Sequence, residues 1–302
     1  MSFSNETKLE IIGSADGFSQ EALLKGIVRG SLSLTLENGV SGCQITTDMS
    51  ELALFTLRFL LGTGAELVPE QLQGLQNKRV YNINLKGAEA QKLLVRVGVK
   101  NDKGEYVGDV IPNLFEDEIR GYVAGVFLSA GEVFIPKGDT SGYQLEFTFA
   151  SYPYAIAFSR LLEGLGFSSK VIERHDNYVL YIKESEEISD LIAYMGASDA
   201  VLKIQSLKVI RAVRNKENRI SNCEVGNIGK VVLAAQRQIS AIFELQKSGK
   251  LDTLDEKLRV VAMLRLSNPE EKLEKLAEIL GISKSCINHR LRKIESIARG
   301  EI

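Results

Sequence analysis

Apolar residues recur at helical spacing on both sides of a glycine near the end of the chain, which predicts two short amphipathic helices. These residues are Leu273, Leu276 and Leu280 before the glycine, and Ile287, Leu291 and Ile294 after it. Gly281 tolerates the left-handed backbone that ends a helix in a tight turn, and Ser283 is a suitable N-cap for the second helix. Together with the small residue Ala277, they fit the helix-turn-helix pattern.

The second of these helices is expected to present polar and cationic side chains to solvent. At about 100° per residue, Ser285, His289 and Arg292 lie opposite its apolar face, where they can donate to base edges of DNA. Cations at the flanks of this face are expected to meet phosphates. The predicted DNA-binding residues of the helix are Lys284, Ser285, Asn288, His289, Arg290, Arg292 and Lys293. The alternative is an ordinary helical hairpin with a solvated face.

The first two thirds of the chain carry one pattern of helices and strands twice. In the first copy we predict a helix that runs into a strand at 22–36, a strand near 43–47, a helix at 49–61, a strand at 79–85 and a helix at 88–97. In the second we predict a helix at 120–130, strands near 132–135 and 144–149, a helix at 153–165, strands near 170–174 and 178–183, and a helix at 186–195.

The two copies keep a nearly constant offset. Gly26 and Gly125 are 99 residues apart, and the motif R-x-L-x-G-x-G at 58–64 recurs 102 residues later at 160–166. We therefore predict a duplicated αββαββα body with pseudo-twofold symmetry, in which small residues let the first helices of the two copies approach closely. The alternative is two unrelated α+β pieces.

The net charge of −2 over 302 residues hides an asymmetry. Residues 1–202 hold 17 Lys+Arg and 27 Asp+Glu, a net −10, whereas residues 203–302 hold 20 and 12, a net +8. A basic C-terminal third on an acidic body favours a polyanionic partner at the C-terminal end. The strand pattern also stops near residue 200. The predicted domains are two repeats at 1–104 and 105–199, a basic linker at 200–226, and an all-α helix-turn-helix domain at 227–302.

Composition argues against several other classes of protein. Hydrophobic residues make up 44% and charged residues 25%, which is typical of a globular protein. The first residues do not form a signal peptide, and no apolar run is long enough to span a membrane. The three cysteines are scattered, and the two histidines, His175 and His289, are far apart. We therefore expect a reduced, cytoplasmic protein with no metal and no cofactor.

Three groups of residues together resemble the WhiA family of bacterial DNA-binding regulators. The first is in the basic stretch and comprises Arg211, Arg214, Asn215, Asn218, Arg219, Asn222, Cys223, Asn227, Lys230, Ala235, Gln238 and Ile239. The second comprises Leu264, Arg265 and Leu266, Asn268 and Pro269, residues 282–285, and residues 288–291. The third is the duplicated body, which is similar to the LAGLIDADG fold of homing endonucleases.

The resemblance covers essentially the whole chain, and it implies a sequence-specific regulator of transcription. The family is tied to sporulation in some bacteria and to cell division and chromosome segregation in others. The expected partner is double-stranded DNA, with other regulators or the transcription machinery as further candidates. We expect a nucleoid-associated monomer whose internal pseudo-twofold symmetry comes from the duplication.

The fold of the body raises a nuclease as the rival hypothesis. In homing endonucleases the two central helices each end with an acid, and this pair holds the divalent metals between which a phosphodiester is cut. The corresponding positions here are Ser31 and Ala130, and Glu132 lies two positions past its slot. We therefore expect no catalytic residues and no enzymatic activity. A protein-interaction scaffold is the remaining alternative.

The basic stretch and the body each leave two interpretations open. Arg211, Arg214 and Arg219 could contact DNA phosphates, or the Asn-rich segment around them could be a capped loop, since Asn tolerates turn geometry. The twofold sheets of the body could form a saddle on DNA. Its net charge of −10, however, argues against strong affinity for phosphates, and a role in sensing a protein or a ligand is equally open.

Overall fold

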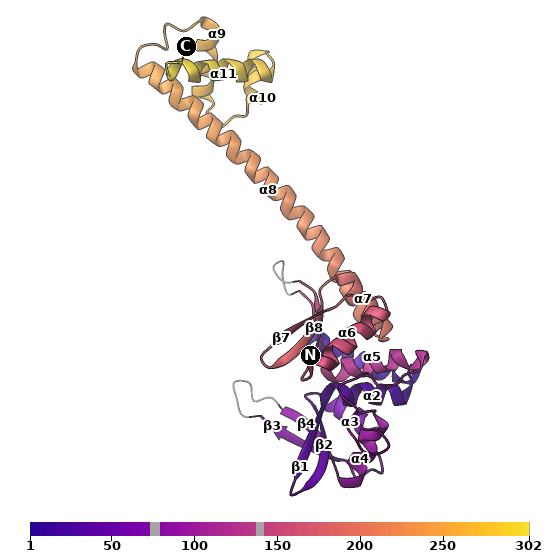
Figure 1. Ribbon diagram of the computed structural model, residues 1–302. Helices are drawn as coiled ribbons and strands as arrows, with labels where there is room; N and C mark the ends of the chain where they lie inside the picture. The colour runs from indigo at the N-terminus through magenta and orange to yellow at the C-terminus, as the bar shows by residue number, and fades with distance from the viewer. Residues whose placement is uncertain (73–78, 137–141, 302) are drawn as a thin grey trace. The chain divides into compact units, whose positions relative to one another are not determined.

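The computed structural model describes residues 1–72, 79–136 and 142–301, which form two compact units, Met1–Ile210 and Arg211–Ile302 (Figure 1). The first unit opens with α1 (Phe3–Gly13) and the 3-10 helix η1 (Ala15–Gly17). Then follow α2 (Gln20–Ser31), β1 (Leu32–Glu37), β2 (Val40–Thr47), α3 (Ser50–Arg58), β3 (Glu66–Gln71), β4 (Arg79–Lys86) and α4 (Gly87–Arg96). The next elements are α5 (Glu116–Ala130), β5 (Gly131–Phe134), β6 (Gln144–Phe149), α6 (Tyr152–Gly164), β7 (Lys170–Arg174), β8 (Asn177–Ile182) and α7 (Ser185–Tyr194).

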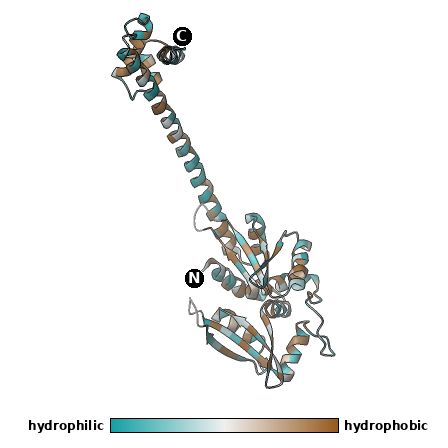
Figure 2. Ribbon diagram, turned by 60° about the vertical axis from the view of Figure 1, so that its left-hand side comes forward, coloured by the Kyte–Doolittle hydropathy of each residue, from teal (hydrophilic) through white to brown (hydrophobic). Residues whose placement is uncertain are grey.

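Two four-stranded antiparallel sheets with the same topology form the first unit. Their strand orders are β1-β2-β4-β3 and β5-β6-β8-β7. An apolar row crosses the first sheet at Leu32, Ile45, Ile83 and Leu67, and its counterpart in the second is Gly131, Phe147, Leu180 and Val171. Figure 2 shows hydrophobic and hydrophilic residues alternating along the strands, as expected where one sheet face is covered by helices. The predicted duplicated αββαββα body is confirmed.

The two copies meet through α2 and α5, whose backbones touch at a pair of glycines. A β-carbon on Gly26 would lie 2.2 Å from the carbonyl oxygen of Tyr122, and one on Gly125 would lie 2.2 Å from that of Leu23. Hydrogen is therefore the only side chain that fits at either position. This confirms the predicted role of the small residues in the first helix of each copy.

The pattern of apolar residues did not predict α1 or β3, and each has a physical reason. In α1 the buried side chains include the polar Ser4, Thr7 and Lys8, so the helix shows no apolar stripe. The hydroxyl of Thr7 is satisfied within the helix, because it donates to the carbonyl of Phe3 at 2.9 Å. β3 contains Pro69 and mostly exposed residues, which an edge strand tolerates because one side of its backbone makes no ladder hydrogen bonds.

Four helices make up the remainder of the chain: α8 (Ser198–Lys247), α9 (Glu256–Ser267), α10 (Leu273–Leu280) and α11 (Lys284–Ala298). α8 begins in the first unit and ends in the second. The helix predicted to start near residue 228 is therefore its second half, and the capped-loop interpretation of the Asn-rich segment is wrong. No proline interrupts 198–247, and asparagine inside a helix costs only a fraction of a kcal/mol, roughly 0.7 or less.

The second unit has its own apolar core, to which all four helices contribute. Its most buried residues are Ile242 and Leu245 of α8, Val261 and Ala262 of α9, Leu276 of α10, and Ile287, Leu291 and Ile294 of α11. This core holds the helix-turn-helix pair against α8 and α9. Among the residues that the structure describes, no helix combines the length and apolar character needed to cross a membrane.

Candidate nucleic-acid interface

The turn between α10 and α11 has the geometry that its sequence predicts. Gly281 adopts φ 64° and ψ 28°, in the left-handed region, at the C-terminal end of α10. A β-carbon there would meet nothing within 4 Å, so the backbone conformation, and not a lack of space, favours glycine. Ser283 caps α11, because its hydroxyl accepts from the backbone N–H of Cys286 at 3.2 Å.

Packing fixes the rotation of α11 about its axis. Ile287, Leu291 and Ile294 are completely buried, and they pack in one cluster with Leu276 and Ala277 of α10. Since residues three and four apart share one face of a helix, the opposite face of α11 must point to solvent. The core therefore determines which side chains α11 presents.

The predicted DNA-binding residues of α11 lie on and beside this outer face. Its exposed members are Lys284, Ser285, His289, Arg292 and Lys293. Two further members, Asn288 and Arg290, are half-buried at its edges. The helix carries no acid before Glu295, so the exposed face combines hydrogen-bond donors with positive charge.

The three predicted arginines of the basic stretch lie on α8 and form a separate group. Arg214 and Arg219 are exposed, whereas Arg211 is half-buried. Lys230 of the same helix borders a cavity that Lys284 also lines. At about 1.5 Å per residue, Arg219 lies roughly 16 Å along the helix axis from Lys230, and Arg211 roughly 28 Å. The structure therefore does not bring these arginines together with the outer face of α11.

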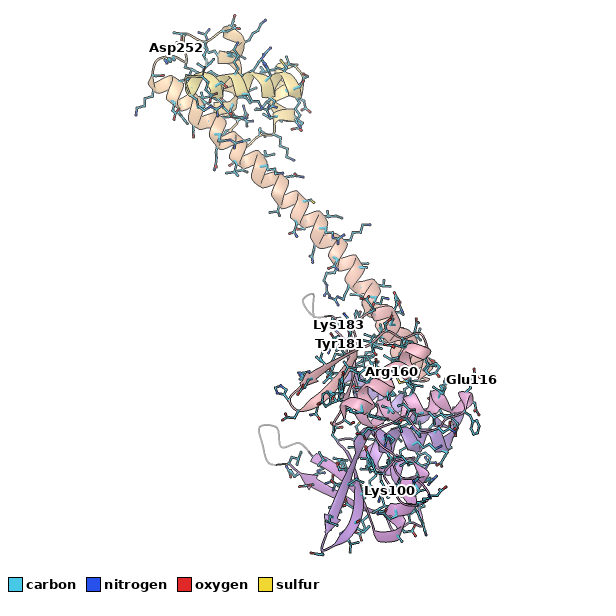
Figure 3. All side chains as sticks on the ribbon, viewed as in Figure 1. Lys100, Glu116, Arg160, Tyr181, Lys183 and Asp252 are labelled. Atoms are coloured by element: carbon cyan, nitrogen blue, oxygen red, sulfur yellow. The ribbon has the colours of Figure 1, made fainter. Side chains whose placement is uncertain are left out.

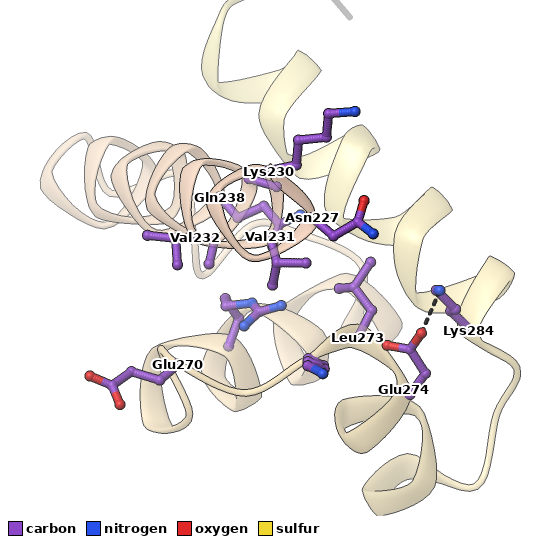
Figure 4. Close-up of a pocket in the computed structure, with 13 residues that line it drawn as sticks. Asn227, Lys230, Val231, Val232, Gln238, Glu270, Leu273, Glu274 and Lys284 are labelled. Atoms are coloured by element: carbon purple, nitrogen blue, oxygen red, sulfur yellow. Dashed lines mark ion pairs between the residues drawn. The ribbon is translucent and has the colours of Figure 1, made fainter. Parts of the chain in front are cut away.

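An ion pair modifies the charge of α11 at its first residue. The ammonium of Lys284 lies 2.5 Å from a carboxylate oxygen of Glu274 on α10 (Figure 4). The hydrogen bond from Lys284 lowers the pKa of Glu274, so the pair stays charged at neutral pH. The sequence of α11 gives no sign of this contact, because the partner of Lys284 comes from the preceding helix.

In the body, the ends of the two central helices are the positions at which a homing endonuclease carries its acids. α2 ends at Ser31, whose hydroxyl donates to the carbonyl of Ile27 at 3.0 Å, and α5 ends at Ala130. Glu132 is exposed on β5 and faces Glu146 across the ladder to β6. Within 1–72, 79–136 and 142–301, no group of three or more His, Cys, Asp or Glu side chains could hold a metal ion.

The cations of the body are largely occupied by neighbouring groups. Ion pairs join Arg96 to Glu21 at 2.6 Å, Lys86 to Glu37 at 2.6 Å, Lys203 to Glu6 at 2.6 Å, and Arg174 to Glu146 at 3.9 Å. Near the end of β8, the ammonium of Lys183 lies 5.1 Å from the ring centroid of Tyr181 (Figure 3). These contacts satisfy cations that would otherwise attract phosphates.

Comparison with known proteins bears on both units. The family model of the WhiA C-terminal HTH domain matches residues 218–298, and that of the WhiA LAGLIDADG-like domain matches residues 119–214. The probable cell division protein WhiA of Clostridium acetobutylicum is 36% identical, over 99% of this chain and 98% of its own. The chain belongs to the WhiA family. The probable cell division protein WhiA of Clostridium tetani is 35% identical, over 99% of this chain and 97% of its own.

A solved structure supports the same assignment at the level of the fold. The crystal structure of full-length DUF199/WhiA from Thermatoga maritima matches with a TM-score of 0.57 and 23% identity, covering 99% of this chain and 98% of that one. The predicted family and fold class are therefore confirmed. This chain thus combines the LAGLIDADG-like domain of the WhiA family with its C-terminal HTH domain.

Two polar residues of the second unit were not predicted as site residues, although both carry the family resemblance. Arg265 on α9 is 2% exposed, and Gln238 on α8 is 4% exposed. The available signal was the sequence Leu264-Arg265-Leu266, in which a cation interrupts an apolar stretch of a helix. A buried arginine requires an explanation, because Arg is almost never fully buried without a partner.

Proposed function

We propose that this WhiA-family protein is a sequence-specific DNA-binding regulator of transcription that acts at the nucleoid, in cell division, chromosome segregation or sporulation. One observation carries the proposal: Ile287, Leu291 and Ile294 are completely buried, and the face of α11 opposite them is exposed, free of acids and rich in donors. A helix of this kind fits the major groove of DNA, which is about 12 Å wide.

In the proposed complex the side chains of α11 divide into two groups. Ser285, His289 and Arg292 donate to base edges, and an arginine in this position is suited to the two acceptors of guanine. Lys293 and Arg290 meet phosphates on either side of the groove. Lys284 joins them by exchanging the carboxylate of Glu274 for a phosphate oxygen.

We assign the other segments supporting roles. In residues 200–226, the proposed basic linker, Arg211, Arg214 and Arg219 contact phosphates outside the site read by α11. The repeats at 1–104 and 105–199 form a catalytically inactive body. The absence of acids at Ser31 and Ala130, and a net charge of −10 over 1–202, favour a body that neither cuts DNA nor binds it strongly. Residues 227–302 are the proposed DNA-binding domain.

The test begins with genome-wide crosslinking and DNA sequencing, which gives the bound motif. Binding of the full-length protein is then titrated against a duplex of this motif and a scrambled duplex at several salt concentrations. We expect His289→Ala and Arg292→Ala each to lose about 1–3 kcal/mol of preference for the motif. Arg259→Ala, which removes an exposed cation of α9, is the matched control and should retain the preference. Unchanged discrimination in both α11 variants would contradict the proposal.

A second assay separates a regulator from a nuclease. The purified protein is incubated with supercoiled plasmid and a genomic library in the presence of Mg²⁺ or Mn²⁺. We expect no nicking above a control without metal, because a two-metal mechanism needs paired acids as ligands. Metal-dependent cleavage would establish an enzyme and overturn the proposed role of the body.

A further inference from the structure

A cavity of about 610 Å³ lies within the second unit, between the second half of α8, the end of α9 and the start of α10 (Figure 4). Val231 and Val232 of α8 and Leu273 of α10 give it apolar walls. Lys230, Lys272 and Lys284 border it with positive charge, accompanied by the acids Glu270 and Glu274. Such a combination of apolar walls with a few polar groups is typical of pockets for small molecules.

Two buried polar side chains line this cavity, and each has one atom without a hydrogen-bond partner among the described residues. The guanidinium of Arg265 donates through Nη1 to the carbonyls of Asn268 at 3.3 Å and Glu271 at 2.8 Å. Its Nε is buried and has no acceptor among the described residues. The Oε1 of Gln238 is likewise buried and has no donor there. Since buried polar groups are nearly always paired, these two atoms are the groups in the cavity that are available to a partner from outside the chain.

The charge of Arg265 is also uncompensated by the protein. No carboxylate forms an ion pair with it within the described part of the chain, and burial lowers its pKa. One of the two rim acids, Glu274, is paired with Lys284 at 2.5 Å. A buried cation without a counter-ion is costly, so an anion that reached it would be held strongly. The planar guanidinium favours a carboxylate or phosphate group.

We propose that this cavity binds a small organic oxyanion. Its phosphate or carboxylate group accepts from Nε of Arg265, a hydroxyl or amine donates to Oε1 of Gln238, and an apolar part packs on Val231 and Leu273. Lys230 adds long-range attraction at the rim. The inference does not depend on the proposed function, because it rests only on the cavity and the side chains that line it.

The burial of Arg265 and the volume of the cavity favour a free small molecule as the ligand over a phosphate of the DNA backbone. Arg265 is only 2% exposed, so a duplex on the protein surface does not reach its guanidinium. The cavity volume lies within the range of about 300–1,000 Å³ that small-molecule sites occupy. The cavity also brings together residues from two segments that carry the family resemblance, Lys230 and Gln238 on α8 and Arg265 on α9. Residues that are far apart in the sequence therefore line one cavity.

The test uses the full-length protein at constant ionic strength in chloride, with three probes in calorimetric titrations. Phenyl phosphate has an oxyanion and an apolar body, inorganic phosphate has the oxyanion alone, and benzyl alcohol has the apolar body alone. We expect saturable one-to-one binding of phenyl phosphate, weaker binding of inorganic phosphate and none of benzyl alcohol. In ¹⁵N NMR spectra, phenyl phosphate should move the Nε–H resonance of Arg265, which R265K assigns by its disappearance.

Variants locate the site. Lys230 is exposed, so Lys230→Ala should fold normally and weaken phenyl phosphate binding about fivefold or more. At pH 5, where a phosphate monoester keeps one proton because its second pKa is about 6, Gln238→Leu should weaken it comparably, because the P–OH of the probe loses its acceptor. Arg259→Ala removes the same charge from the outer surface of α9 and should change the affinity less than about twofold.

Several results would overturn the inference. Absence of saturable binding by both anionic probes, or equal binding of benzyl alcohol, would show that the cavity does not select an oxyanion. Equal losses in Lys230→Ala and Arg259→Ala would indicate general attraction of anions to a basic unit. If no probe binds but Lys230→Ala and Gln238→Leu weaken binding to duplex DNA, the cavity serves the DNA backbone and no small molecule.

Discussion

The exposed cations of the body and those of α11 differ in whether a carboxylate lies beside them. In the body, Arg96 is joined to Glu21 and Lys86 to Glu37 by ion pairs of 2.6 Å. On α11, Arg292 and Lys293 form no ion pair with any described residue, and only Lys284 has a carboxylate beside it. Because an exposed ion pair removes most of the attraction for a distant phosphate, the comparison predicts that the second unit alone attracts DNA.

The units also differ in what holds their central helices together. In the body, α2 and α5 touch backbone to backbone at Gly26 and Gly125, so the contact accepts no larger residue. In the second unit, α10 and α11 are held by interlocking side chains around Ile287 and Leu291. The first interface requires the absence of side chains at the two glycines, whereas the second requires large buried side chains. We therefore expect the first to be disrupted by larger residues and the second by smaller ones.

The largest expected effect follows from enlarging the glycine contact. Gly26→Leu or Gly125→Leu should unfold the body or cost it at least roughly 1–3 kcal/mol, because even the first added carbon would lie 2.2 Å from a backbone oxygen. Urea denaturation followed by circular dichroism measures the loss. Gly164→Ala is the matched control, since a β-carbon there meets nothing within 4 Å. Unchanged unfolding of both leucine variants would refute this account of the interface.

Dividing the chain tests the electrostatic side of the comparison. We expect residues 200–302 to fold and bind duplex DNA alone, with an affinity that falls steeply as salt rises, because bound phosphates release condensed counterions. Residues 1–199, which carry most of the acidic excess, should bind weakly at any salt concentration. Fluorescence anisotropy with a labelled duplex measures both fragments. Strong binding by 1–199 alone would invert the assignment and favour a different role for the helix-turn-helix.

Periodicity and internal repeats predicted most of this architecture because they report directly on burial. The repeat offset identified Gly26 and Gly125 as partners, since a glycine that recurs in a duplicated helix indicates the same close contact in both copies. The helix-turn-helix was predicted for a similar reason. The requirement for a left-handed backbone at Gly281 and for a buried face around Ile287 leaves a local trace in the sequence.

Other features depend on contacts that no local pattern contains. α1 buries polar residues such as Thr7, whose hydroxyl is satisfied by its own backbone, so hydropathy gave no sign of the helix. The pairing of Glu274 with Lys284 depends on how α10 packs on α11. The cavity around Arg265 is lined by residues of four helices, so it depends on how these helices pack together. These three features could not be predicted because each depends on how residues from different parts of the chain pack together.

A smaller effect is expected from changing the turn of the second unit. Gly281→Ala should destabilise this unit by about 1–2 kcal/mol, because a β-carbon clashes with the backbone in the left-handed region. Gly281→Asn should lose less, since asparagine tolerates this conformation best after glycine. Thermal unfolding of the 200–302 fragment would compare the two variants. Equal stability of Gly281→Ala and the unaltered fragment would mean that φ at this position differs from 64° in solution.

The smallest effect concerns the one cation of α11 that resembles those of the body. Glu274→Gln releases Lys284 from its carboxylate, so affinity should rise by a few-fold at most, and equally for the motif and a scrambled duplex, because Lys284 meets phosphates and not bases. The gain should shrink as salt rises. Glu278→Gln is the control, because it removes the same charge from α10 but frees Lys275, which is not on α11. Equal gains in the two variants would show that only the total charge of the unit matters. A larger gain for Glu274→Gln would show that the internal ion pair competes with DNA for Lys284.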